Sequence, residues 1–161
     1  MKLKVKKSSD KMLFLIGMAI AMFGLLIPFI KVEEGMMNIF MAASRFNEGG
    51  IAYISTFIVI VWLAVLVAIV LYFITESIVA DTLAWLVAAG FGIAFFVAMS
   101  VYHYENVYDE EVQSFVSGVF GWIFIGSYIV FIGMTTALVS VVLQAMHLQH
   151  PIQPKSSAAA N

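Results

Sequence analysis

The sequence predicts an all-α integral membrane protein, a four-transmembrane-helix bundle with its N-terminus and C-terminus both in the cytoplasm. Hydrophobic residues make up 63% of the 161 residues and charged residues 11%, and the mean hydropathy is +1.02. A soluble domain averages roughly 45–50% apolar and about 25% charged residues. Four long windows, residues 12–30, 49–75, 82–104 and 112–154, contain no Asp, Glu, Lys or Arg. Most of the basic residues lie in the first eleven positions, up to Lys11.

Each charge-free window is long enough for one crossing, because a helix needs about 20 apolar residues to cross ~30 Å of hydrocarbon. The last window is longer, but its final third is polar, so we expect one span there. The predicted spans are residues 12–30, 52–75, 78–101 and 115–143, joined by outer loops 31–51 and 102–114. They form a single membrane domain, 12–147, between a basic tail, 1–11, and a flexible tail, 148–161.

The orientation follows from the basic residues, since cytoplasmic flanks carry the excess of Lys and Arg. The lysines at the N-terminus are therefore expected in the cytoplasm, and four crossings return the C-terminus, with Lys155, to the same side. Of the basic residues, only Lys31 and Arg45 fall in the predicted outer loops. The sequence thus predicts a multi-pass protein of the cell membrane, plasma or inner, with the lipid bilayer as its first partner.

Several functional classes are disfavoured by residues that the sequence lacks. It contains no Cys, which excludes disulfides, thiol redox chemistry and thiolate metal sites. No ionisable residue falls in the central part of a predicted span, although proton-coupled carriers and voltage sensors need one there. Haem held between spans needs axial ligands such as His, and the His residues fall at or beyond the predicted membrane ends. We predict no cofactor, no metal and no nucleic-acid partner.

Small residues recur along one side of each predicted span, as expected for helices that pack closely in lipid. The most regular set is on the fourth span and ends in two polar residues: Gly118, Gly126, Gly133, Ala137, Ser140 and Gln144. These residues share one side of a helix at about 100° per residue. They either close the bundle or face another membrane protein or a second copy of the chain.

The first outer loop contains a group of large, soft apolar side chains, Met36, Met37, Phe40 and Met41, at helical spacing. This stretch is expected to lie on the membrane surface or to cap the bundle. Alternatively it offers an adaptable Met-rich surface for docking a partner. Three methionines would also suit Cu(I).

The second outer loop is acidic, with Glu105, Asp109, Glu110 and Glu111. A solvated loop explains these residues most simply. Carboxylates at this density would also suit Ca²⁺ or Mg²⁺, and His103 with Glu105 and Asp109 would suit Zn²⁺. A further alternative is a mouth that concentrates cations.

Together these features predict a non-enzymatic accessory, assembly or regulatory subunit of a larger membrane complex, or a homo-oligomer. The alternative is a small oligomeric channel for uncharged solutes with an acidic mouth. Its lining would come from polar residues of the fourth span: Ser127, Thr135, Thr136, Ser140 and Gln144. A third interpretation is an interfacial enzyme using Glu76 and Asp81, although a solvated turn between the second and third spans explains these two carboxylates more simply.

Overall fold

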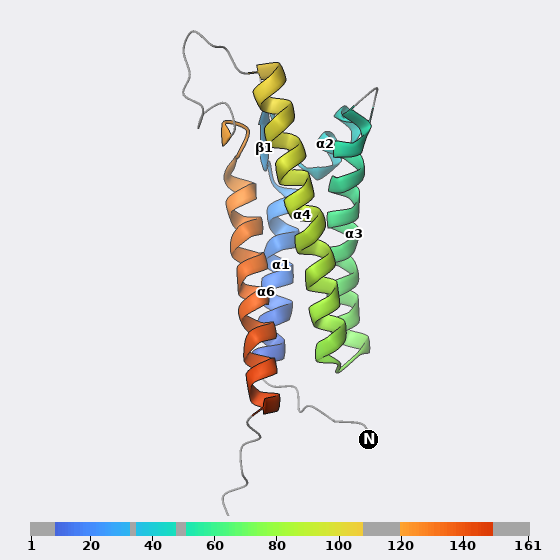
Figure 1. Ribbon diagram of the computed structural model, residues 1–161, viewed down its shortest axis with the longest axis vertical. Coiled ribbons are helices and arrows are strands. Elements are labelled where there is room, and N and C mark those ends of the chain that lie inside the picture. Colours follow the sequence, from blue (N-terminus) through green and yellow to red (C-terminus); the bar gives the residue numbers. More distant parts are fainter. Residues whose placement is uncertain (1–8, 33–34, 48–50, 108–119, 150–161) are drawn as a thin grey trace, which may run out of the picture.

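The computed structural model describes residues 9–32, 35–47, 51–107 and 120–149. Four long helices stand side by side in it (Figure 1). They are α1 (Ser9–Leu26), α3 (Ala52–Ile74), α4 (Ile78–Val107) and α6 (Ile125–Gln149). Each is long and apolar enough to cross a membrane. The predicted helical fold class is therefore confirmed, and the four helices suggest a multi-pass membrane protein.

The helices form two close pairs, α1 with α6 and α3 with α4, and the contacts between the pairs are less extensive. Glycines let the backbones of α1 and α6 approach closely. A Cβ atom built on Gly17 would lie 2.7 Å from the carbonyl oxygen of Gly133, and one built on Gly24 would lie 2.8 Å from that of Gly126. Such contact between small residues is the usual means by which helices associate in lipid.

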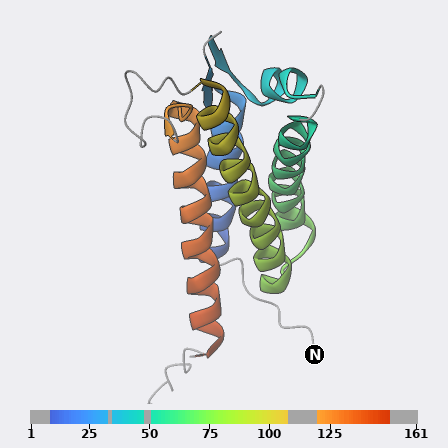
Figure 2. The ribbon, with the colours of Figure 1, turned by 45° about the horizontal axis from the view of Figure 1, so that its top comes forward.

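A small cap covers one end of the bundle, which we call the cap end (Figure 2). It consists of strand β1 (Ile30–Val32), strand β2 (Gly35–Met37) and the short helix α2 (Ile39–Arg45). The strands pair antiparallel, with Ile30 opposite Met37. The segment before α6 joins them, since Ile30 forms an isolated bridge with Ile123 and the Lys31 amide donates to the Trp122 carbonyl at 2.8 Å.

Aromatic side chains fill the space beneath this cap. The Trp122 indole is 1% exposed and donates to the Ser100 hydroxyl of α4 at 3.1 Å. Its ring lies 5.7 Å from the Phe95 ring, which in turn lies 6.0 Å from the Phe29 ring. Edge-on and tilted contacts of this kind add to the stabilisation that aromatic side chains gain from burial. The cap is therefore anchored to both helix pairs.

The other end of the bundle, which we call the turn end, holds the short turn between α3 and α4. The first described residue of α1 and the last of α6 also lie at this end (Figure 1). The helix bounds differ from the predicted spans at several places, among them the end of α1 at Leu26 instead of residue 30 and the end of α6 at Gln149 instead of residue 143. Helix α1 starts at Ser9 and so includes Lys11, α4 continues past residue 101 to Val107, and α6 starts only at Ile125.

Candidate functional site

Helix α2 is held in place by contacts at its start and along its inner side. The Asn38 side chain caps it, accepting from the Phe40 amide at 3.2 Å and from the Met41 amide at 3.1 Å. Ile39 and Ala42 are buried, and the Ser55 hydroxyl of α3 donates to the Ala43 carbonyl at 2.7 Å. A capped and buried helix of this kind presents its remaining side chains in a fixed arrangement.

Three of the four predicted docking residues lie on the surface: Met36 is 52% exposed, Phe40 60% and Met41 55%. Met37 is 7% exposed and belongs to the core. The four residues do not lie on one helix, as their spacing in the sequence predicts. Met36 and Met37 belong to strand β2, and the helix starts at Ile39. The strand–helix junction nevertheless brings the side chains together. We call Met36, Met37, Phe40 and Met41 the α2 surface.

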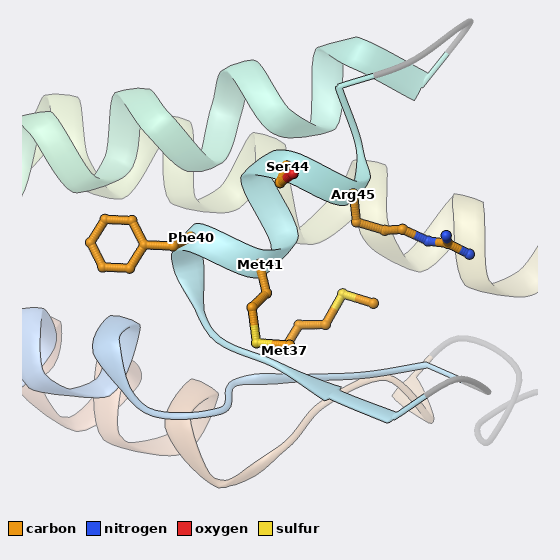
Figure 3. Close-up of a pocket in the computed structure, with 5 residues that line it drawn as sticks. All are labelled: Met37, Phe40, Met41, Ser44 and Arg45. Carbon is orange, nitrogen blue, oxygen red and sulfur yellow. The ribbon is translucent and has the colours of Figure 1, made fainter.

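A shallow, open hollow of about 510 Å³ lies beside α2 (Figure 3). It is lined by Met37, Phe40, Met41, Ser44 and Arg45. In Figure 3 the Phe40 ring and the Arg45 guanidinium point in opposite directions from α2. The Phe40 ring contacts Trp62 of α3 edge-on, with the ring centroids 6.2 Å apart. The hollow is thus apolar on the Phe40 side and positively charged on the other.

The small-residue face of α6 is covered by α1 of the same chain. A Cβ atom on Gly126 would meet the carbonyl oxygen of Gly24 at 2.5 Å, and one on Gly133 would meet that of Gly17 at 2.6 Å. Ala137 and Ser140 are fully buried and Gln144 is 6% exposed. Gly118 lies outside the described residues. This face therefore closes the α1–α6 pair, and a partner would have to use another surface.

The predicted acidic outer loop lies mostly outside the described residues, which include Glu105 but not Asp109, Glu110 or Glu111. Glu105 is an exposed residue near the end of α4, whereas His103 is 6% exposed. Within the described ranges, no three His, Cys, Asp or Glu side chains are grouped in a way that could hold a metal ion.

The polar residues of the alternative channel do not form one lining. The Ser127 hydroxyl donates to the Phe29 carbonyl at 2.6 Å. The Thr135 and Thr136 hydroxyls donate to carbonyls of their own helix, those of Phe131 and Ile132, each at 2.8 Å. Only Ser140 and Gln144 lie together, at the turn end, where the Gln144 amide donates to the Ser140 hydroxyl at 3.1 Å.

The turn end contains a buried polar cluster that the sequence did not reveal. Lys11 is only 2% exposed. Its ammonium donates to the backbone carbonyl of Thr75, the C-cap residue of α3. It also lies 5.6 Å from the centroid of the Tyr72 ring, which is within cation–π range. From α6, the Ser140 hydroxyl donates to the Asp10 carbonyl of α1. We call this group the turn-end cluster, and its side chains are those of Lys11, Tyr72, Asp81, Ser140 and Gln144.

Asp81, in the first turn of α4, is the least satisfied member of the turn-end cluster. It is 0% exposed, and neither carboxylate oxygen has a hydrogen-bond partner among the described residues. The Lys11 ammonium and the Gln144 amide act on it electrostatically, but the former donates to Thr75 and the latter to Ser140. Buried polar groups are normally paired, and ionisable residues within membrane helices usually mark function.

Two predictions from the sequence are wrong at this end. Lys11 is not part of a basic tail but a buried residue of α1. Asp81 does not share a solvated turn with Glu76, because Asp81 is buried while Glu76 is exposed. The sequence does contain a signal for Asp81. Small residues recur along one side of the third predicted span, at Ala80, Ala84, Ala88 and Gly92, and Asp81 lies three and seven residues before Ala84 and Ala88, on the same side of a helix. Both alanines face the core.

Comparisons with known proteins add no assignment, since no model of a protein family, no curated protein and no solved structure matches the chain.

Proposed function

We propose that this chain is a non-enzymatic protein that crosses the cell membrane four times and acts as an accessory, assembly or regulatory subunit of a larger membrane complex. In the other form of this proposal, the partner is a second copy of the chain and the protein forms a homo-oligomer. The observation that carries it is the α2 surface, where Met36, Phe40 and Met41 stay exposed although α2 is capped by Asn38 and buries Ile39 and Ala42.

The α2 surface suits a protein partner for two physical reasons. Methionine side chains adapt their shape to a partner, and a rigid support reduces the conformational entropy lost on association. The hollow beside α2 adds a charge, the guanidinium of Arg45, on the side opposite Phe40. A partner with an apolar segment would complement the Met and Phe side chains of this surface.

The same proposal includes an orientation in the membrane. The basic N-terminal residues favour the cytoplasm for the turn end, which places the cap and the α2 surface outside. At that level the partner would be another membrane protein, or a second copy, whose extracytoplasmic part reaches the headgroup region.

Site-specific photocrosslinking in native membranes tests the proposed docking surface. We expect a photoreactive amino acid at Met41 to give a discrete protein adduct, because this side chain is 55% exposed on the α2 surface. The matched control is Val67, which is 50% exposed on α3 and should contact only lipid. Differently tagged copies of the chain would show whether the adduct contains a second copy.

A substitution on the α2 surface provides a second comparison. Met41→Glu places a charge there while α2 keeps its cap and its buried contacts, so a photoreactive residue at Met36 should lose its adduct. The proposal is contradicted if positions 41 and 67 give the same lipid-only products, or if Met41→Glu leaves the adduct at position 36 unchanged.

A further inference from the structure

The turn-end cluster connects the two helix pairs, and docking at the cap end makes no use of it. Lys11 belongs to α1, which pairs with α6, whereas Thr75 is the C-cap of α3 and Asp81 lies in the first turn of α4. The Lys11 ammonium donates to the Thr75 carbonyl and is also the cation that acts on the Asp81 carboxylate. The Lys11 side chain therefore binds one acceptor of the opposite helix pair, the Thr75 carbonyl, and its charge also acts on a buried carboxylate of that pair.

The protonation state of Asp81 determines which acceptor is the better one. A buried carboxylate without a hydrogen-bond donor is costly in free energy, whereas a neutral carboxylic acid carries no charge that needs compensation. Ionisation therefore favours moving the Lys11 ammonium from the Thr75 carbonyl to the Asp81 carboxylate, because both partners are then charged and attract each other more strongly in a buried site than in water.

We propose that Asp81 is a proton-binding site whose occupancy decides whether α1 is joined through Lys11 to the end of α3 or to the start of α4. With the proton bound, the carboxylic acid is neutral and Lys11 stays on the Thr75 carbonyl, as in the structure. When the proton leaves to water at the turn end, the carboxylate binds the Lys11 ammonium and the Thr75 carbonyl loses this donor. The site thus couples proton binding to the packing of the two helix pairs.

Within the residues that the structure describes, few other titratable groups face this site from the elements packed around it. From α1 these are Lys11 itself and Asp10, whose carbonyl accepts from Ser140. Helix α3 contributes Tyr72, whose ring lies beside the Lys11 ammonium, and α6 contributes the uncharged Gln144 amide. Glu76 in the turn is exposed. Among the described residues, Asp81 is the only buried carboxylate in this region.

Infrared difference spectroscopy of the full chain in lipid tests the proton site directly. A pH change from about 5 to about 9 starts above the ordinary pKa of an Asp carboxyl, about 3.9, so only a carboxyl that still holds its proton at pH 5 contributes to the difference. We expect the carbonyl stretch of a carboxylic acid to disappear over this range in the wild type and to be missing in Asp81→Asn, which keeps the side-chain shape. Glu76→Gln, the exposed control in the same region, should leave this band unchanged.

Spin-label distances test the coupling, and the absence of native Cys allows labels to be placed freely. The exposed residues Met12 of α1 and Val79 of α4 report on the turn end, and Phe23 with Val101 reports on the cap end. We expect the first distance to change with pH and the second to stay constant. Lys11→Met should abolish the pH-dependent change in the distance between positions 12 and 79 but keep the infrared band of Asp81. A variant that simply failed to fold would lose both.

The proposal is overturned if the wild type shows no carboxylic-acid band that depends on Asp81. It is also overturned if the distance between positions 12 and 79 is independent of pH, or if it still depends on pH in Lys11→Met. These readouts do not involve the α2 surface, so their failure would leave the docking proposal unaffected. If Asp81→Asn does not fold, the Lys11→Met variant and the wild-type distances still decide the question.

Discussion

At the scale of single residues, glycine has opposite roles in two helices of this bundle. In α6, Gly133 faces the backbone of α1, and a Cβ atom there would lie 2.6 Å from the Gly17 carbonyl oxygen. In α4, a Cβ atom on Gly90 would have nothing within 4 Å. The first glycine is required by a close approach of two backbones, whereas the second is not.

We therefore expect Gly133→Ala to lower the free energy of unfolding by about 1–3 kcal/mol, the usual cost of overpacking. Gly90→Ala should leave stability unchanged or raise it slightly, since alanine is the better helix former. Denaturation of both variants in mild detergent, followed by circular dichroism, would compare them. Equal effects of the two substitutions would contradict the close packing of α1 against α6.

The candidate sites differ in how far single residues could be predicted from the sequence. The sequence grouped Met36, Met37, Phe40 and Met41 but left open whether they cap the bundle or dock a partner, and only Met37 is buried. Burial of Lys11 and Asp81 did not follow from charge counting, because a charge at a helix end looks the same in sequence whether it faces water or a neighbouring helix. For Lys11 only the packing of the four long helices at the turn end distinguishes the two cases, whereas for Asp81 the spacing to Ala84 and Ala88 is a signal in the sequence.

At the scale of elements, α2 depends on its N-terminal cap, since only seven residues form this helix and isolated helices of that length are unstable. The Asn38 side chain accepts from two of the amides that would otherwise lack partners. The fixed α2 surface therefore depends on a single side chain that lies outside it.

Replacing Asn38 by Ala should weaken α2 by about 0.5–2 kcal/mol. The expected result is faster hydrogen–deuterium exchange of the Phe40 and Met41 amides, while the amides of the long helices keep their protection. Asn38→Ser retains a capping oxygen and should preserve most of the protection. Unchanged exchange in Asn38→Ala would show that tertiary contacts alone hold the helix.

Element boundaries can be predicted well where composition changes sharply and poorly where it does not. Helix α3 runs from Ala52 to Ile74, almost the predicted span, because an apolar run ends at Thr75 and Glu76. Helix α4 continues to Val107 through polar residues whose composition is typical of a loop. The strands and their bridge to Ile123 depend on contacts between distant segments, which no local pattern in the sequence reports.

At the scale of the whole molecule, the first and last long helices form one pair and the two middle helices form the other. The sequence could not assign this pairing, because every predicted span carries small residues. Polar contacts that join the pairs include the Trp85 indole donating to the Met134 carbonyl at 2.9 Å and the Lys11 ammonium donating to the Thr75 carbonyl. A bundle built from two pairs allows a change at the turn end while the cap holds the other end.

Both proposals assume four crossings, with the cap outside and both ends of the chain inside. Single cysteines at Asn47, Glu76 and Lys155, introduced into the naturally Cys-free chain, can be tested with a membrane-impermeant maleimide. We predict labelling of position 47 in intact cells, and labelling of positions 76 and 155 only after permeabilisation. Labelling of position 76 or 155 in intact cells, or protection of position 47, would contradict the topology.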